Sequence, residues 1–192
     1  MELPFVPAAT RHISLTLTGQ QRVGVVGPNG SGKSTLLKVL ARQLQPLAGK
    51  CRMSVEGIYL DQRLASLDPR RTVLEQMLAA NGMAAEGDLR MRLAHLGLDN
   101  RKIAARSGSL SGGERLKAAL ACVLYADPPP HLLLLDEPSN HLDLPSVQAL
   151  ETMLRGYQGA LMVVSHDDAF MTRLGLTERL VATEQGWRTE PW

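Results

Sequence analysis

The chain has 192 residues, of which 44% are hydrophobic and 21% are charged, and its formal net charge is +2. This composition is typical of one globular domain and excludes a disordered chain or a disulfide scaffold. A charge close to neutral indicates neither a polyanionic partner nor its absence. Cys51 and Cys122 lack metal-ligand spacing, so we interpret them as core residues. No apolar run is long enough to span a bilayer and no secretory signal is visible, so we expect a cytoplasmic protein without direct membrane insertion.

Hydrophobic periodicity and turn residues predict strands that alternate with helices. In chain order, the expected elements are a strand at 12–17, a strand at 21–26, a helix at 33–42, a strand at 58–60, helices at 73–80, 89–96 and 112–125, a strand at 132–135, a helix at 147–154, and strands at 161–164 and 179–182, before a hairpin that contains Trp187. This alternation predicts an α/β fold with a largely parallel core sheet.

Residues 64–110 differ from the rest of the chain. Asp68 and Pro69 mark a turn, and the amphipathic segments 73–80 and 89–96 follow it without an intervening strand. We therefore expect one domain over residues 1–192, with residues 64–110 as a helical subdomain inserted on the main sheet.

A glycine-rich loop follows the strand predicted at 21–26. It reads Gly-Pro-Asn-Gly-Ser-Gly-Lys-Ser and fits the phosphate-loop pattern G-x-x-x-x-G-K-[ST]. The strand before it and the helix after it are the context in which backbone N–H groups surround phosphate oxygens. We therefore predict that ATP is bound by Gly27, Pro28, Asn29, Gly30, Ser31, Gly32, Lys33, Ser34 and Thr35.

Three residues of this loop have separate expected roles. Lys33 can reach the β- and γ-phosphates, Ser34 can ligate Mg²⁺, and Thr35 can contact the α-phosphate. The alternative is an ordinary glycine-rich turn between a strand and a helix, which the flanking elements disfavour.

Two carboxylates follow the apolar run at 132–135. Asp136 and Glu137 stand at the end of a predicted buried strand, where ligands bind in open α/β sheets. Asp136 can hold Mg²⁺ through water, and Glu137 can serve as the base that orients an attacking water. By itself the pattern is also that of a strand ending in a polar turn, but about a hundred residues after a phosphate loop it indicates a magnesium site.

A second glycine motif, Leu110-Ser111-Gly112-Gly113-Glu114, opens the helix predicted at 112–125. Ser111 and Glu114 have capping-box spacing, which explains the motif without any ligand. Two glycines in a first helical turn nevertheless weaken the helix, so we expect a close approach to this backbone. Because one nucleotide cannot normally use two helix N-termini of one monomer, Ser111, Gly112 and Gly113 are predicted to contact ATP on a facing domain.

Together these residues resemble the ATP-binding cassette (ABC) ATPase family. Residues 27–34 resemble its Walker A motif, 132–137 its Walker B motif and 110–114 its signature. Gln62 is similar to the Q-loop glutamine, Asp143 to the D-loop aspartate and His166 to the switch histidine. The resemblance covers residues 27–166 in the family's order, and it implies a P-loop NTPase fold with small antiparallel strands and a helical subdomain.

The resemblance also implies a head-to-tail dimer in which two cassettes enclose two ATP molecules. The implied catalytic residues are Glu137, His166, Lys33 and Gln62, and the implied metal ligands are Ser34, Gln62 and Asp136. Asp143 would act across the dimer interface, beside the signature residues. Phe5 is the one candidate for stacking on adenine, and simple packing is the alternative for its ring.

The residues before Asp143 indicate a branch of the family. Asn140, His141, Leu142 and Asp143, together with a Tyr-Leu-Asp-Gln Q-loop at 59–62, resemble the ABC-F branch of soluble twin-cassette proteins. That likeness implies action on the ribosome and a second cassette as partner, in the same chain or in a homodimer. This chain holds one cassette, and the short span from Gln62 to Leu110 lacks the long arm insertion that the family's first cassette commonly carries, so we expect the second cassette of a longer protein. A genuine single-cassette protein is the alternative.

Two further hypotheses stay open. The first is the ATP-binding subunit of a transporter, in which the surface around Gln62 docks onto a membrane protein. The second is a nucleotide-dependent interaction module with little turnover, which the presence of Glu137 and His166 disfavours.

Overall fold

A computed structural model describes every residue except 56, 61–66 and 141. The chain forms two compact units. The first, here called the sheet unit, comprises Met1–Asp61, His131–Pro138 and Gln158–Trp192. The second, the helical unit, comprises Gln62–Pro130 and Ser139–Tyr157. Among the described residues, no helix is both long enough and apolar enough to cross a membrane.

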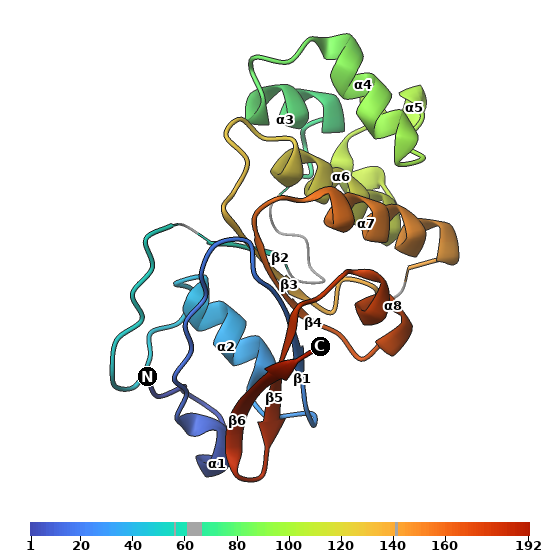
Figure 1. The fold of residues 1–192 in the computed structure, drawn as a ribbon. Helices are drawn as coiled ribbons and strands as arrows, with labels where there is room; N and C mark the ends of the chain where they lie inside the picture. The colour runs from blue at the N-terminus through green and yellow to red at the C-terminus, as the bar shows by residue number, and fades with distance from the viewer. Residues whose placement is uncertain (56, 61–66, 141) are drawn as a thin grey trace. The chain divides into compact units, whose positions relative to one another are not determined.

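The sheet unit contains a six-stranded sheet in the order β2-β3-β4-β1-β5-β6 (Figure 1). Its strands are β1 (Arg22–Val26), β2 (Gly57–Leu60), β3 (Leu132–Asp136), β4 (Ala160–Val164), β5 (Glu178–Thr183) and β6 (Gly186–Pro191). Every neighbouring pair is parallel except β5 and β6, which form an antiparallel hairpin. The predicted α/β fold with a mostly parallel sheet is therefore confirmed, and so is the hairpin around Trp187.

Two interior strands, β3 and β4, explain why the sheet is parallel. β3 and β4 are apolar without interruption until Asp136, and each of their residues is buried. Strands buried on both faces are typical of parallel sheets covered by helices. Helix α2 (Lys33–Leu40) packs on β2, β3 and β4, and short helices α1 (Ala8–Arg11) and α8 (Asp168–Arg173) belong to the same unit.

The helical unit carries the remaining helices. These are α3 (Val73–Ala80), α4 (Glu86–His95), α5 (Asn100–Ala104), the 3₁₀ turn η1 (Ser107–Ser109), α6 (Gly112–Leu124) and α7 (Leu144–Gly156). α6 packs against α3, α4 and α7, and fully buried Leu89, Leu93, Leu98 and Leu120 contribute to this core. The expected division into one domain with a subdomain at 64–110 stays a prediction.

Most predicted elements are present within a few residues. α7 begins at Leu144, three residues before its predicted start, because Asp143 caps it and Pro145 occupies its first turn. α2 ends at Leu40, and Arg42 takes a left-handed φ of 57°. The strand predicted at 12–17 is wrong, since His12 makes only an isolated bridge with Glu2. Apolar and polar residues alternate there, but no described strand pairs with the segment beyond His12.

Candidate functional site

Three loops of the sheet unit begin at the carboxyl ends of neighbouring parallel strands. β3, β4 and β1 are adjacent, and the ladder pairs Val25 with Val164 and Val164 with Asp136. The phosphate loop follows β1, Glu137 follows β3, and His166 follows β4. The register therefore brings three of the predicted motifs to one edge of the sheet, the edge at which open α/β sheets bind ligands.

The phosphate loop has the backbone that its glycines allow. Gly27, Gly30 and Gly32 have φ values of 145°, 77° and 100°, a region that L side chains rarely adopt. A Cβ added to Gly27 would lie 2.9 Å from the carbonyl oxygen of Ala182. The loop therefore requires glycine at Gly27 both for its conformation and for its approach to β5.

Two polar side chains of this loop, those of Ser31 and Lys33, are buried. The Lys33 ammonium donates to the carbonyl oxygens of Gly27, at 2.7 Å, and Pro28, at 2.9 Å. The Ser31 hydroxyl is buried without a hydrogen-bond partner. Gly32 caps α2 without a side-chain hydrogen bond. A buried hydroxyl without a partner and a helix N-terminus without a side-chain cap are what an anion-binding loop presents to phosphate.

The charge of Lys33 in the phosphate loop interacts with two carboxylates. Lys33 is 7% exposed, and burial lowers the pKa of its ammonium, while the carboxylates of Glu137 and Asp136 oppose that shift. A buried ammonium is stabilised by added negative charge. The electrostatics therefore favour a phosphate-bearing ligand.

The acidic end of β3 is held from two sides. Asp136 is 9% exposed, and its Oδ2 accepts a hydrogen bond of 2.9 Å from the Tyr59 hydroxyl on β2. Glu137 has a left-handed φ of 52°, and its backbone N–H donates to the carbonyl oxygen of Val164 at 2.9 Å. A non-glycine residue in this conformation is uncommon and is often found at functional sites.

Glu137 and His166 contact each other. His166 Nε2 lies 3.3 Å from Glu137 Oε1, and the His166 backbone N–H donates to Oε2 at 3.3 Å. The His166 side chain is 56% exposed and that of Glu137 is 14% exposed. The structure therefore brings together two of the predicted catalytic residues, although they are 29 positions apart in the sequence.

The oxygen donors of this edge fit magnesium. Asp136 offers a carboxylate, and Ser34 offers a hydroxyl from the first turn of α2, where Thr35 follows it. Among the described residues, no three or more His, Cys, Asp or Glu side chains form a metal-binding group. Mg²⁺ usually takes one or two carboxylates and completes its shell with water and phosphate oxygens, so this donor set suits magnesium bound with a nucleotide.

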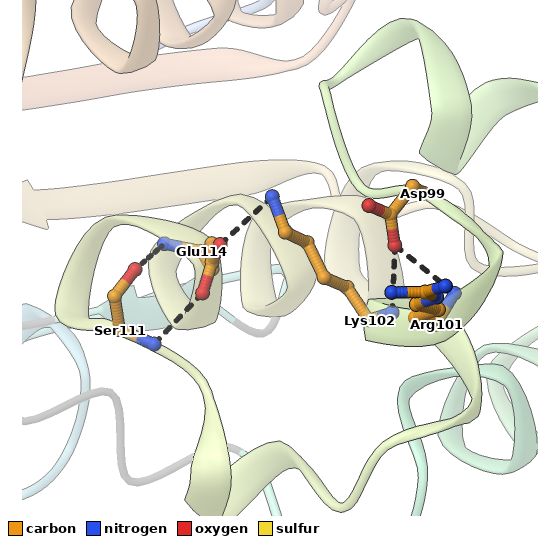
Figure 2. A network of polar contacts seen from close by, with 5 residues as sticks. All are labelled: Asp99, Arg101, Lys102, Ser111 and Glu114. Atoms are coloured by element: carbon orange, nitrogen blue, oxygen red, sulfur yellow. Dashed lines mark hydrogen bonds and ion pairs between the residues drawn. The ribbon is translucent and has the colours of Figure 1, made fainter.

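The signature turn lies in the helical unit and is held by its own residues (Figure 2). Ser111 Oγ accepts from the Glu114 backbone N–H at 3.3 Å, and Glu114 Oε2 accepts from the Ser111 backbone N–H at 2.9 Å. Glu114 Oε1 forms an ion pair of 3.0 Å with Lys102 Nζ. Asp99 in turn caps α5, which carries Lys102. The predicted capping box is therefore confirmed.

Titration reflects this network. The hydrogen bond from the Ser111 backbone and the contact with Lys102 lower the pKa of the Glu114 carboxyl to about 2, and Glu114 raises the pKa of Lys102. The network is therefore fully charged at neutral pH.

The two glycines of the signature differ in their surroundings. A Cβ added to Gly113 would lie 3.3 Å from Leu142 Cδ2 and from Ser146 Oγ, whereas one added to Gly112 would meet nothing within 4 Å. Asp143 accepts a hydrogen bond from the Ser146 backbone N–H at 3.0 Å, and its hydrogen bonds with Ser146 lower the pKa of its carboxyl. A side chain at Gly113 would therefore crowd its neighbours within the helical unit, whereas the space around Gly112 is open.

Several predicted residues stand apart. Gln62 lies outside the described residues, as does His141 of the branch motif. Phe5 is 90% exposed with a φ of 58°, so its alternative role in packing is wrong, and stacking on adenine stays a prediction. Tyr59 and Lys102 were not predicted as site residues, because their contacts depend on strand register and on helix packing.

Comparison with known proteins gives a consistent picture. A family model described as "ABC transporter" matches residues 10–140. ATP-binding protein Uup of Haemophilus influenzae is 37% identical over 167 residues, which are 84% of this chain and 26% of that protein. ABC transporter F family member 3 of Arabidopsis thaliana is 36% identical over 168 residues, 86% of this chain and 23% of that protein. The chain spans about a quarter of the length of these relatives.

Solved structures resemble the fold. The dimeric structure of MJ0796, a bacterial ABC transporter cassette, has a TM-score of 0.75 at 21% identity and covers 95% of this chain and 90% of that one. The structure of RNase-L Inhibitor has a TM-score of 0.70 at 27% identity and covers 90% of this chain and 34% of that one.

Proposed function

This chain belongs to the ABC transporter family as one of its ATPase domains, and we propose that it binds Mg-ATP and hydrolyses it to ADP and phosphate at an interface with a second cassette. The observation that carries the proposal is the meeting of the phosphate loop, Asp136, Glu137 and His166 at one edge of the sheet unit. A phosphate cradle, a magnesium ligand and a carboxylate–histidine pair are the parts that phosphoryl transfer to water requires.

The roles follow from the chemistry of each group. Lys33 and the loop N–H groups hold the phosphates, and Ser34, Gln62 and Asp136 are the proposed ligands of magnesium. Glu137 orients and deprotonates the attacking water, and His166, 3.3 Å from it, contacts the γ-phosphate. Catalysis by this set depends on positioning and charge stabilisation more than on covalent chemistry.

The signature supports the second cassette. Ser111 is exposed at the N-terminus of α6, and the open space around Gly112 leaves the backbone accessible. We infer that Ser111, Gly112, Gly113 and Asp143 act on ATP held by the facing cassette, in the same polypeptide or in a homodimer. The relatives that are several times longer than this chain are compatible with either arrangement.

The finer assignment is an ABC-F type cytoplasmic ATPase that acts on the ribosome. Its support is the Asn-His-Leu-Asp motif at 140–143 and the similarity to ABC transporter F family member 3. On this assignment the chain is the second cassette of a twin-cassette protein.

Glu137→Gln tests the catalytic assignment. The amide keeps the size of the side chain and its hydrogen-bond acceptor but cannot take a proton, so ATP binding should stay and turnover should fall by about 100-fold or more. Phosphate release measures turnover, and a fluorescent ATP analogue measures binding. Normal hydrolysis by the variant would remove Glu137 from the catalytic role.

Co-sedimentation tests the proposed action on the ribosome. Glu137→Gln, with the equivalent change in any second cassette, is placed in the native polypeptide that carries this sequence, and Mg-ATP is added to cell extract. We expect ATP-dependent sedimentation with ribosomes. Sedimentation with membranes would favour the transporter subunit and overturn the ribosome assignment.

A further inference from the structure

The Tyr59 hydroxyl makes a hydrogen bond that the proposed reaction has not used. Its Oη donates to Asp136 Oδ2 at 2.9 Å, and both residues belong to the sheet unit. The contact follows from the register, in which Tyr59 on β2 pairs with Leu134 on β3. Asp136 is two residues beyond Leu134 and therefore points to the same face, at a diagonal distance that a tyrosine side chain can bridge.

Asp136 depends on this donor. Its side chain is 9% exposed, and in the part of the chain that the structure describes Tyr59 is its one side-chain hydrogen-bond donor. The charge of Lys33 interacts with that of Asp136, but the Lys33 ammonium donates its hydrogen bonds to the carbonyl oxygens of Gly27 and Pro28. A carboxylate that is nearly buried needs hydrogen bonds to keep one orientation.

The Tyr59 ring itself is anchored. It is half-buried and packs against the apolar cluster that includes Leu134 and residues of α2. A tyrosine has few rotatable bonds, so a packed ring carries its hydroxyl at a fixed place. The hydroxyl therefore occupies Oδ2 of Asp136 and leaves Oδ1 for other partners.

We propose that Tyr59 is a positioning residue for magnesium, which holds the Asp136 carboxylate with Oδ1 turned to the metal or its water. This inference rests on the proposed Mg-ATP site. Hydrogen bonds to a ligating carboxylate fix its direction and are a large part of the strength of a metal site. The competing explanation is that the bond only stabilises the pairing of β2 with β3.

Tyr59→Phe tests the inference, because it removes one hydroxyl and keeps the ring. Mn²⁺ serves as the probe, and electron paramagnetic resonance measures its affinity in the presence of ADP. We expect Tyr59→Phe to weaken Mn²⁺ binding by about 10- to 100-fold. ADP affinity measured in EDTA should be unchanged, since the phosphate loop is intact.

Tyr157→Phe is the matched control. Tyr157 is 8% exposed, and its hydroxyl donates to the Pro130 carbonyl oxygen at 2.8 Å within the helical unit. This variant also loses a tyrosine hydrogen bond, so it reports the effect of lost stability alone. Its Mn²⁺ affinity should match that of the unaltered protein.

A double-mutant cycle separates positioning from stability. On an Asp136→Asn background, Tyr59→Phe should change Mn²⁺ affinity by less than about twofold, since its effect acts through the carboxylate. Mn²⁺ affinity of Tyr59→Phe equal to that of the unaltered protein would overturn the inference, and so would an equal loss in Tyr157→Phe. Absence of nucleotide-dependent Mn²⁺ binding in the unaltered protein would instead count against the proposed function.

Discussion

Two serine- and glycine-containing turns of this molecule differ in how their polar groups are hydrogen-bonded. The phosphate loop and the signature turn each place serine and glycine at the start of a helix. At α6, Ser111 and Glu114 satisfy each other's backbone N–H groups. At α2, the cap Gly32 offers no side chain, and the Ser31 hydroxyl is buried without a partner. Helix N-termini require hydrogen-bond acceptors. The signature turn supplies these acceptors from its own side chains, whereas the phosphate loop is suited to a ligand that supplies them.

The electrostatics of the two turns differ in the same way. Burial lowers the pKa of Lys33 and so disfavours its charged form, whereas the surroundings of Glu114 favour its charged form and lower its pKa to about 2. The buried polar groups of the phosphate loop therefore lower the free energy of unfolding but are available to bind a ligand. The signature turn is held by hydrogen bonds between its own residues. This contrast can be tested by substitutions on both sides.

The largest effect is expected from Lys33→Ala. The ammonium is the one side-chain cation that the structure places within the phosphate loop, so its loss should weaken ATP binding by at least about 100-fold, or about 2.7 kcal/mol. Titration with a fluorescent ATP analogue measures the change. Lys38→Ala, which removes the same charge from the last turn of α2, should leave the affinity unchanged, and unaltered binding by Lys33→Ala would contradict the proposed phosphate site.

Ser31→Ala should move stability and binding in opposite directions. It removes a buried hydroxyl that has no partner, so the free energy of unfolding should rise by about 1 kcal/mol. If the hydroxyl serves phosphate, ATP affinity should fall by about tenfold, or about 1.4 kcal/mol. Urea unfolding and nucleotide titration measure the two quantities. A variant that is both less stable and unaffected in binding would show that the phosphate loop does not differ from an ordinary turn.

The serine-to-alanine change in the signature turn should alter the free energy of unfolding in the opposite direction. Ser111→Ala removes the cap of α6, which should lower the free energy of unfolding by about 1 kcal/mol. ATP affinity of the isolated chain should not change, since we expect this serine to act on a facing cassette. Ser109→Ala, two residues earlier and outside the capping box, is the control for a lost serine hydroxyl.

Local patterns in the sequence were sufficient to predict most of the fold. The apolar runs of β3 and β4 and the helix signals before α6 are local features that survive folding, so these elements are confirmed within a residue or two. The strand at 12–17 has an equally good alternation and is absent. A strand requires a neighbour with free backbone groups, and alternation carries no information about that neighbour.

The same reasoning explains which contacts of the site escaped prediction. Motif order and strand ends place Glu137 and His166 at one edge, and the structure has them in contact. The contact of Tyr59 with Asp136 depends on which strand borders β3 and in what register. The ion pair of Lys102 with Glu114 depends on the placement of α5 beside the start of α6. Neither the register of β2 on β3 nor the placement of α5 beside α6 can be read from a single sequence.

The smallest expected effect belongs to Lys102→Met, which removes the cation from the signature network and keeps its stem. An ion pair whose side chains are 38% and 23% exposed is screened by solvent and is expected to contribute little to the free energy of unfolding at pH 7. Arg90→Met breaks the more exposed pair with Glu86 on α4 and should cost less than Lys102→Met.

The pH dependence identifies the carboxyl that is responsible. Glu114 has its pKa lowered from 4.5 to about 2, so its stabilisation is present above its unfolded pKa and is lost as the pH falls toward about 2. Lys102→Met should raise the folded pKa of Glu114, because it removes one cause of the shift. The difference in unfolding free energy between the two proteins should therefore be full at pH 7 and shrink in acid. A difference in urea unfolding that stays constant from pH 7 down to about pH 2 would show that Lys102 stabilises the turn by packing and not through the charge of Glu114.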